Sequence, residues 1–406
     1  MIHSIHIKGF RGIESGSMSK FKQFNIFVGA NNAGKSAVME ALYLACTTNQ
    51  EVALIREEDD GIKSNTVLLS KVDLLGNNPF RLIGGKHGDF GDLDLSRIGE
   101  RVLIVDVPDS KATLQQFELD IAKSKLAAES ITFFALDNSQ ENEDLAKLIW
   151  QEVDSLSDAS RIVFCWYPDL TYYFKGSASW IISGQPPAAE HTFFCDTSVV
   201  QSYIPIAFYR RVLNEVPGWA YRIADHFAAI FELDPNAFTV QFVPVAGNPE
   251  KLQGRISPRD KPALSIDAFG DGARAAFKLL APLIVMAELA TPEAPGLLLW
   301  EEPESFQNPK TLGKLLEEVV KIVRDKPIQV FIATHNLELV AYITQMLQCK
   351  DLDPKETMLF HLSLSNGQLK SSWFDRDTLI TWLDSGIDPR AWKDFVPPLQ
   401  FQLQEN

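Results

Sequence analysis

Cysteines and long apolar runs are scarce in this chain. Its 406 residues include four cysteines, without a Cys-x-x-Cys pair or a histidine at ligand spacing, so neither a disulfide framework nor a zinc site is predicted. The longest apolar run, 279–287, contains Pro282 and ends before Glu288, well short of the roughly 20 residues that span a bilayer. The first four residues lack the basic-then-apolar pattern of a signal peptide. These absences predict a soluble cytoplasmic protein with free thiols and no membrane contact.

Positive charge is also in short supply. Lysine and arginine number 38 against 53 aspartates and glutamates, which gives a net charge of −15. A general nucleic-acid coat needs clustered basic side chains, so the balance disfavours that class, although a local basic patch can still bind DNA. The candidate residues for such a patch are Arg210, Arg211, Arg255, Arg259 and Lys261.

The two ends of the chain carry a pattern typical of a parallel sheet covered by helices on both faces. The sequence contains no internal repeat, no low-complexity tract and no sustained heptad pattern, so a long coiled coil is not expected. Apolar or alternating runs predict strands at 2–10, 24–28, 296–300 and 328–333, and helical spacing predicts helices at 35–46, 273–290 and 312–323.

The middle of the chain is interpreted as an inserted mixed α/β lobe that rejoins the core. Strands are predicted at 101–107, 131–136, 161–167 and 238–245, and residues 203–233 are predicted to be mostly helical. The predicted division is 1–48 for the N-terminal half of the core, 49–261 for the lobe that partly completes it, and 262–406 for the C-terminal half and tail. In the tail we expect a strand at 358–364, a turn at Asn366-Gly367, and short helices carrying Trp373, Trp382 and Trp392.

A phosphate-binding loop is the most specific motif. Residues 29–36 fit the pattern GxxxxGK[ST] at every fixed position, between a predicted strand and a predicted helix. The glycines allow successive backbone N–H groups to point at phosphate oxygens, Lys35 brings positive charge to the β- and γ-phosphates, and the Ser36 hydroxyl suits Mg²⁺. The predicted ATP-binding set is Gly29, Ala30, Asn31, Asn32, Ala33, Gly34, Lys35, Ser36 and Ala37.

Polar residues follow the two late apolar strands. A buried parallel strand would deliver Glu301 and Glu302 to the sheet edge where the phosphates should lie. Glu301 is expected to hold Mg²⁺ through water together with Ser36, and Glu302 to polarise the attacking water. His335, after the next strand, is positioned to donate to the γ-phosphate. Lys35, Glu302 and His335 are therefore the predicted catalytic residues.

A glycine turn opens the long predicted helix near residue 273. Gly270, Asp271 and Gly272 would leave backbone N–H groups exposed at the positive end of the helix dipole, which suits an anion. A plain helix cap by Asp271 is the alternative interpretation.

The order of these motifs resembles the ABC-class P-loop ATPases of the RecF, SMC and OLD (overcoming lysogenisation defect) type. The resemblance rests on the phosphate loop, Phe-Gly-Asp-Gly, Leu-Leu-Leu-Trp-Glu-Glu-Pro-Glu and Ala-Thr-His-Asn, and Lys-Gly-Phe-Arg-Gly-Ile at 8–13 is similar to the family's first strand. It covers residues 1–48 and 262–345, and the few residues after His335 imply that the TOPRIM nuclease domain of OLD proteins is absent.

The resemblance implies how the site is completed. Two ATP molecules would lie between two head-to-tail subunits, with Gly270 and Gly272 contacting the γ-phosphate held by the partner's Lys35. His335 would be the switch histidine, and Arg11 would approach the nucleotide from the first strand. The segment 305–309 falls where the family has its dimer-contact loop.

Three functions remain open at this stage. The first is a dimeric ATP-hydrolysing switch for a protein effector, as in bacterial anti-phage defence systems built on similar ATPases. The second is a RecF-like, DNA-binding repair or maintenance ATPase. The third is a scaffold that binds ATP with little turnover.

Overall fold

The computed structural model describes most of the two ends of the chain and parts of its middle. The described residues are 1–46, 48–58, 61–70, 73–76, 101–106, 161–166, 189, 191–259, 261–386 and 388–391. The predicted strand at 131–136 and the predicted position of Trp392 lie outside them. None of the helices within these ranges combines the length and the apolar character that crossing a bilayer requires.

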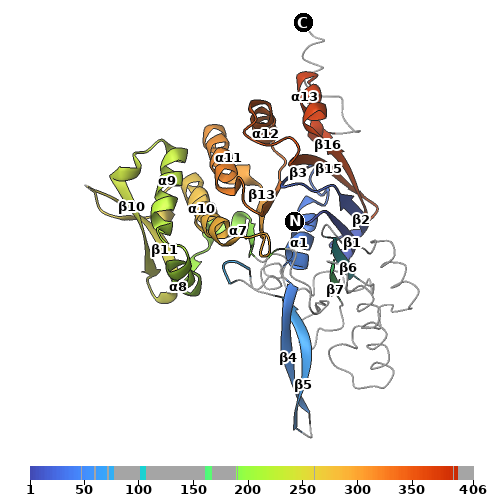
Figure 1. The fold of residues 1–406 in the computed structure, drawn as a ribbon, viewed down its shortest axis with the longest axis horizontal. Helices are drawn as coiled ribbons and strands as arrows, with labels where there is room; N and C mark the ends of the chain where they lie inside the picture. Colours follow the sequence, from blue (N-terminus) through green and yellow to red (C-terminus); the bar gives the residue numbers. More distant parts are fainter. Residues whose placement is uncertain are drawn as a thin grey trace.

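A mixed ten-stranded sheet forms the body of the described molecule (Figure 1). Five neighbouring strands are parallel, and the three central ones are almost wholly buried because helices cover both faces. In sheet order these are β15 (Thr357–Ser365), β3 (Phe24–Val28), β14 (Ile328–Ala333), β13 (Gly296–Glu301) and β8 (His191–Cys195).

The other half of the sheet is mainly antiparallel. It contains β16 (Gln368–Phe374), β2 (Ile13–Ser19), β1 (Ser4–Phe10), β6 (Arg101–Asp106) and β7 (Arg161–Trp166) in sheet order. The strands at 24–28 and 328–333 are confirmed, and those at 2–10, 101–107, 161–167, 296–300 and 358–364 are confirmed with ends shifted by one or two residues.

Two strands of this half, β2 and β16, were not predicted. Each is the second strand of a hairpin with a two-residue turn. Arg11 and Gly12 connect β1 to β2, and Asn366 and Gly367 connect β15 to β16, all with positive φ. Paired positive φ values match the twist of antiparallel strands in a tight hairpin. Both strands alternate only loosely between buried and exposed positions, which weakens their sequence signal. The prediction of a helix around Trp373 is therefore wrong, because this residue lies on β16.

Helices cover the two faces of the sheet and create two separate apolar clusters. Alternate residues of a strand point to opposite faces, so Phe27 and Leu299 pack on one side with α1, whereas Ile26 and Leu298 pack on the other with α10, α11 and α12. The helices are α1 (Lys35–Cys46), α7 (Thr197–Gln201), α10 (Asp271–Leu289), α11 (Pro309–Val323), α12 (Leu337–Cys349) and α13 (Arg376–Asp384), with the 3-10 turns η6 (Pro303–Phe306) and η7 (Pro389–Ala391).

A second lobe lies beside α10, on the opposite side of the view from β1 and β2 (Figure 1). The Trp219 ring stacks on Phe242 with centroids 4.5 Å apart, and its indole N–H donates to the Ala281 carbonyl on α10 at 2.7 Å. The lobe contains β9 (Ile204–Pro205), α8 (Ile206–Glu215), α9 (Trp219–Phe231), η4 (Pro235–Ala237), β10 (Phe238–Val245), β11 (Asn248–Pro258), β12 (Leu264–Ser265) and η5 (Ile266–Ala268). The helical prediction for 203–233 and the strand at 238–245 are confirmed.

The region between α1 and the second lobe contributes to the main sheet as well as to a separate hairpin. β6, β7 and β8 all lie in the ten-stranded sheet. β4 (Thr48–Glu58) and β5 (Gly61–Ser70) pair only with each other among the described strands and project away from the body (Figure 1). The exact domain boundaries remain a prediction.

Candidate active site

Four adjacent parallel strands end together at one edge of the sheet. Phe27 lies opposite Ala333, and Ala333 lies opposite Glu301, so β3, β14 and β13 end in one row. Cys195 of β8 lies opposite Trp300, one residue earlier. The segments that follow these strands therefore meet, and they carry the phosphate loop, His335, Glu302 and Asp196.

The phosphate loop bends through backbone conformations that favour glycine. Gly29 has a φ of 145° and Gly34 a φ of 89°. A Cβ atom on Gly29 would lie 2.4 Å from the Leu362 carbonyl oxygen of β15, so the loop's start has no room for a side chain.

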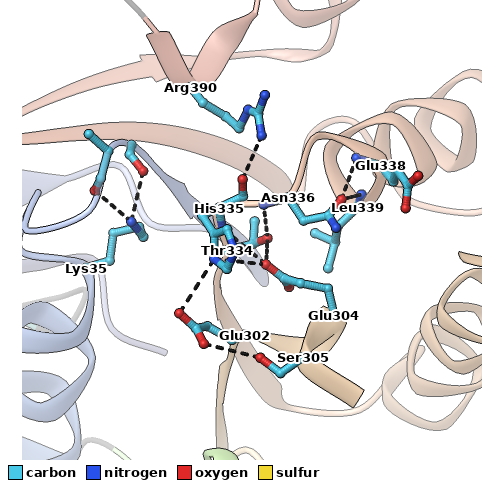
Figure 2. Close-up of polar contacts among 12 residues, drawn as sticks. Lys35, Glu302, Glu304, Ser305, Thr334, His335, Asn336, Glu338, Leu339 and Arg390 are labelled. Atoms are coloured by element: carbon cyan, nitrogen blue, oxygen red, sulfur yellow. Dashed lines mark hydrogen bonds and ion pairs between the residues drawn. The ribbon is translucent and has the colours of Figure 1, made fainter. Parts of the chain in front are cut away.

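Lys35 points back into this loop (Figure 2). Its Nζ donates to the carbonyl oxygens of Gly29 and Ala30, each at 2.9 Å. Burial lowers the pKa of Lys35, and the charges of Glu302, Glu304 and Glu301 act in the opposite direction without cancelling the shift. The ammonium group is thus already held at the loop, facing three carboxylates that balance its charge.

The remaining residues of the predicted ATP-binding set divide by exposure. The exposed members line the open side of the loop, where a polyphosphate and its metal would lie, and the buried ones attach the loop to the core. Ala30, Asn31, Asn32 and Ser36 are exposed, whereas Gly29, Ala33 and Ala37 are buried. The donor set suits Mg-ATP, because Ser36 and Glu301 supply hard oxygen ligands next to backbone N–H groups. Nowhere in the described ranges do three or more His, Cys, Asp or Glu side chains form a metal site by themselves.

The acidic strand end is turned sharply at its second carboxylate. Glu302 has a φ of 48°, and its N–H donates to the Ala333 carbonyl at 2.8 Å, which ties the turn to β14. Its Oε2 accepts from the Ser305 hydroxyl at 3.2 Å. This left-handed turn lifts the Glu302 carboxylate off the strand axis, while Glu301 stays on β13 and is half-buried.

His335 lies directly beside this carboxylate (Figure 2). Its Nδ1 is 3.5 Å from an oxygen of Glu302 and 3.5 Å from Oε1 of Glu304. Glu304 Oε1 also accepts from the Thr334 hydroxyl at 2.6 Å and from the His335 N–H at 3.2 Å. The predicted base and the predicted switch histidine are therefore neighbours within one chain.

Sequence reasoning missed Glu304 as a site residue. Its side chain is only 7% exposed, and among the described residues its second oxygen, Oε2, has no hydrogen-bond partner. The position lies two residues after Glu302 in the same acidic stretch, but the sequence pattern does not distinguish a buried carboxylate from a solvated one.

Asp196 was missed as well. It follows the apolar strand β8 and caps α7, accepting from the Ser198 and Val199 N–H groups at 2.9 and 3.1 Å. Asp196 is 2% exposed and lines one small pocket together with Glu301 and Glu302. The apolar run that ends in Asp196 before a short helix could have indicated a site residue at a strand end. No other motif in the sequence pointed to this segment.

The glycine turn packs against η6 of the same chain. Gly270 precedes the first turn of α10, is exposed, and has open space where a Cβ atom would lie. Gly272 has no such space, since a Cβ atom would lie 2.8 Å from the Phe306 carbonyl oxygen, and its own carbonyl accepts from Gln307 Nε2 at 2.8 Å. The exposed Asp271 pairs with Arg274.

Arg11 is engaged with the helix that follows the phosphate loop. Its guanidinium forms an ion pair with Glu40, which is fully buried in α1. The structure therefore places Arg11 beside the middle of α1, where it ties the β1–β2 turn to the helix that follows the phosphate loop.

Two family models match the chain. The first, described as "AAA ATPase domain", covers residues 1–162. The second, described as "AAA domain, putative AbiEii toxin, Type IV TA system", covers residues 205–341. Together they include the phosphate loop, the glycine turn, the acidic strand end and His335.

Individual proteins are similar to the chain over different lengths. An uncharacterized protein of Methanocaldococcus jannaschii is 44% identical over 54 residues, which are 13% of this chain and only 25% of that protein. An ATP/GTP phosphatase of Helicobacter pylori is 22% identical over 89% of this chain and 92% of its own. The crystal structure of an SMC head bound to the C-terminal winged-helix domain of ScpA superposes with a TM-score of 0.51 at 13% identity, covering 94% of this chain and 99% of that one.

The fold is thus that of the SMC head ATPases, with a parallel-rich sheet. This fold and the two ATPase-domain matches support a P-loop ATPase of the RecF and SMC type.

Proposed function

We propose that this chain binds ATP with Mg²⁺ at the common edge of β3, β14 and β13 and hydrolyses it. The observation that carries the proposal is the shared row of strand ends, which brings Lys35, Glu302 and His335 to one place. These side chains come from segments up to 300 residues apart, and a purely structural role would not require them to converge.

Each residue has a distinct part in this reaction. Lys35 would exchange its loop carbonyls for phosphate oxygens, and Glu302 would accept a proton from the attacking water. His335 would donate to the γ-phosphate and, from its place beside Glu302, report whether that phosphate is present. Mg²⁺, held by Ser36 and through water by Glu301, supplies neutralisation of the charge that develops on the phosphates.

We further propose that two chains close head to tail over two nucleotides. Gly270 is exposed at the start of α10, where the first two N–H groups of the helix precede its first internal hydrogen bond. The Gly270 carbonyl accepts from the Ala273 and Arg274 N–H groups at 3.0 and 3.2 Å, so the surface consists of the N–H groups of Asp271 and Gly272. Such a surface suits the γ-phosphate held by the partner's Lys35. Hydrolysis would remove this contact and reopen the pair, which makes the dimer a nucleotide-driven switch.

The switch would act on a protein effector in the cytoplasm, in bacterial anti-phage defence. A matched family model whose description names a toxin–antitoxin system supports a role together with a second protein. Purification of the tagged full chain from its native host tests this, since a stoichiometric companion protein is expected and its consistent absence would contradict the effector role.

Phosphate release tests the enzymatic core of the proposal. Wild-type protein should release phosphate from ATP with Mg²⁺, and Glu302→Gln should lower the turnover number by about 100-fold or more while still binding ATP. Lys35→Ala should lose binding, because it removes the main charge at the phosphates. Equal near-zero rates for wild type and Glu302→Gln, with ATP still bound, would instead identify a scaffold.

A RecF-like DNA-binding role is the second candidate, and it depends on the basic residues of the second lobe. Arg210 and Arg211 lie on α8, and Arg211 is paired with Glu215. Arg255 lies on β11, and Arg259 and Lys261 follow this strand. DNA affinity that falls steeply with salt would support this role, whereas no binding at low salt would eliminate it.

A further inference from the structure

The backbone of the switch histidine is held from both sides by charged side chains. Below it, Glu304 accepts from the His335 N–H at 3.2 Å. Above it, Arg390 donates from Nη1 to the His335 carbonyl oxygen at 2.7 Å (Figure 2). Charge-assisted hydrogen bonds of this kind restrict a residue more tightly than neutral ones. The position of the imidazole is therefore set partly by a residue 55 positions later in the chain.

The Arg390 guanidinium is held in place for this contact by Asp388. Asp388 accepts from Arg390 Nε at 2.9 and 3.0 Å through its two oxygens, and it also pairs with Nη2. Burial opposes the ionisation of Asp388, but the hydrogen bonds and charge of Arg390 prevail and lower the pKa of Asp388. The guanidinium fork is thus fixed on one side, with Nη1 directed at His335.

The segment around Arg390 is also attached next to the phosphate loop. The Arg390 carbonyl oxygen lies 3.1 Å from Nε2 of His361 on β15. The next residue of β15, Leu362, is the one whose carbonyl oxygen leaves no room for a Cβ atom on Gly29. Residues 388–391 therefore connect the strand that supports the phosphate loop to the residue predicted to sense the γ-phosphate.

We propose that Arg390 is a positioning residue for the switch histidine, so that the docking of segment 388–391 on His335 sets the rate of ATP hydrolysis. The proposal rests on the proposed function. Loss of the Nη1 contact would free the carbonyl side of His335 and let its ring leave the position beside Glu302. Because the contact of Arg390 is with the backbone of His335, ATP binding should be affected much less than turnover.

The competing explanation is that Arg390 merely anchors its own segment, and Arg376 provides a matched control. Arg376 also donates to a backbone carbonyl, that of Leu347 at 3.3 Å, and also pairs with a nearby aspartate, Asp377. The two side chains are similarly exposed, Arg376 at 35% and Arg390 at 32%. Arg376 binds α13 to α12, away from the strand ends that form the site.

The experiment compares Arg390→Ala, Arg390→Lys and Arg376→Ala in the full chain. Arg390→Ala should lower the kcat for ATP by about tenfold or more and leave the KM within about twofold. Arg390→Lys should fall between this variant and wild type, because an ammonium can reach the carbonyl but cannot form the fork with Asp388. Arg376→Ala should keep the wild-type kcat.

A second measurement keeps the test independent of turnover. In protein with labelled histidine, the imidazole signal of His335, assigned with His335→Gln, should shift in Arg390→Ala and stay in place in Arg376→Ala. If wild type hydrolyses ATP but Arg390→Ala has wild-type kcat and an unmoved His335 signal, the inference is wrong and the proposed function stands. If wild type does not hydrolyse ATP, the proposed function fails, and the His335 signal alone decides whether Arg390 positions the ring.

Discussion

At the scale of single residues, the site depends on backbone conformations that few side chains tolerate. Gly29 bends the chain out of β3, and Glu302 bends it out of β13 with a left-handed φ of 48°. A non-glycine residue in this region costs on the order of 1–3 kcal/mol and persists only where its surroundings enforce it. At Glu302 the enforcing contact is the hydrogen bond of its N–H to Ala333. The strained turn is consistent with a catalytic carboxylate at this position.

Gly29 gives a prediction at this scale. Gly29→Ala should lower the free energy of unfolding by about 1–3 kcal/mol, because its methyl group would meet the Leu362 carbonyl oxygen at 2.4 Å. ATP binding should weaken in the same variant, since the loop must shift. Thermal melting and titration with a fluorescent ATP analogue measure the two effects. Gly270→Ala, whose added methyl group meets only open space, serves as the control and should melt like wild type.

At the scale of elements, a buried carboxylate is one of the groups that fasten the second lobe to the core. Glu318 on α11 is 5% exposed and lies 2.6 Å from both Nδ1 of His226 on α9 and Nζ of Lys321. Burial raises the pKa of Glu318, but the hydrogen bonds and charges of His226 and Lys321 outweigh it, so the net shift is downward. The ionised carboxylate thus helps to hold α9 against α11.

The sign of this shift determines a pH dependence. Because the folded-state pKa of Glu318 lies below its unfolded value of about 4.3, its contribution is complete above that pH and is lost as the pH falls through the folded pKa. Glu318→Gln should therefore reduce the free energy of unfolding by about 1–2 kcal/mol at pH 7 and by less at pH 4. Urea unfolding at both pH values measures this. The neighbouring exposed Glu317→Gln should change stability little at either pH, and an equal loss in both variants would contradict the assignment.

At the scale of the whole molecule, the proposed dimer requires each chain to carry two different surfaces that contact nucleotide. The phosphate loop and carboxylates lie at the strand ends, whereas Gly270 is exposed at the start of α10, beside the η6 turn that follows Glu302. In the proposed dimer each surface completes the site of the other chain. The segment from Glu302 to Gln307 then links the two sites, since it holds the base at one end and Gly272 at the other.

The dimer is tested by mass in solution. Glu302→Gln with ATP and Mg²⁺ should shift from 45.4 kDa to about twice that mass in light scattering, because bound ATP is retained. Adding Gly270→Glu should abolish the shift, since a carboxylate would face the partner's γ-phosphate, while the fold tolerates the side chain in open space. Gln241→Glu, on the exposed part of β10, is the charge-matched control. A dimer that forms equally in all three proteins would contradict the proposed arrangement.

The sequence by itself determined the local parts of this protein. The phosphate loop, the wholly apolar strands 24–28 and 328–333, and the helix after the loop follow from short-range spacing and backbone preference. Glu301, Glu302 and His335 were also identified from the sequence, because the end of a strand and the turn after it are formed by consecutive residues.

Tertiary structure alone decided which of these parts meet. The register of β3, β14 and β13 is set by contacts between residues far apart in the chain, and so are the burial of Glu304, the placement of Asp196 and the reach of Arg390 to His335. The return strands of the β1–β2 and β15–β16 hairpins, β2 and β16, escaped sequence analysis, because strands that alternate only loosely between buried and exposed positions carry little periodic signal. Long-range contacts depend on the whole folded chain, and no local pattern encodes them.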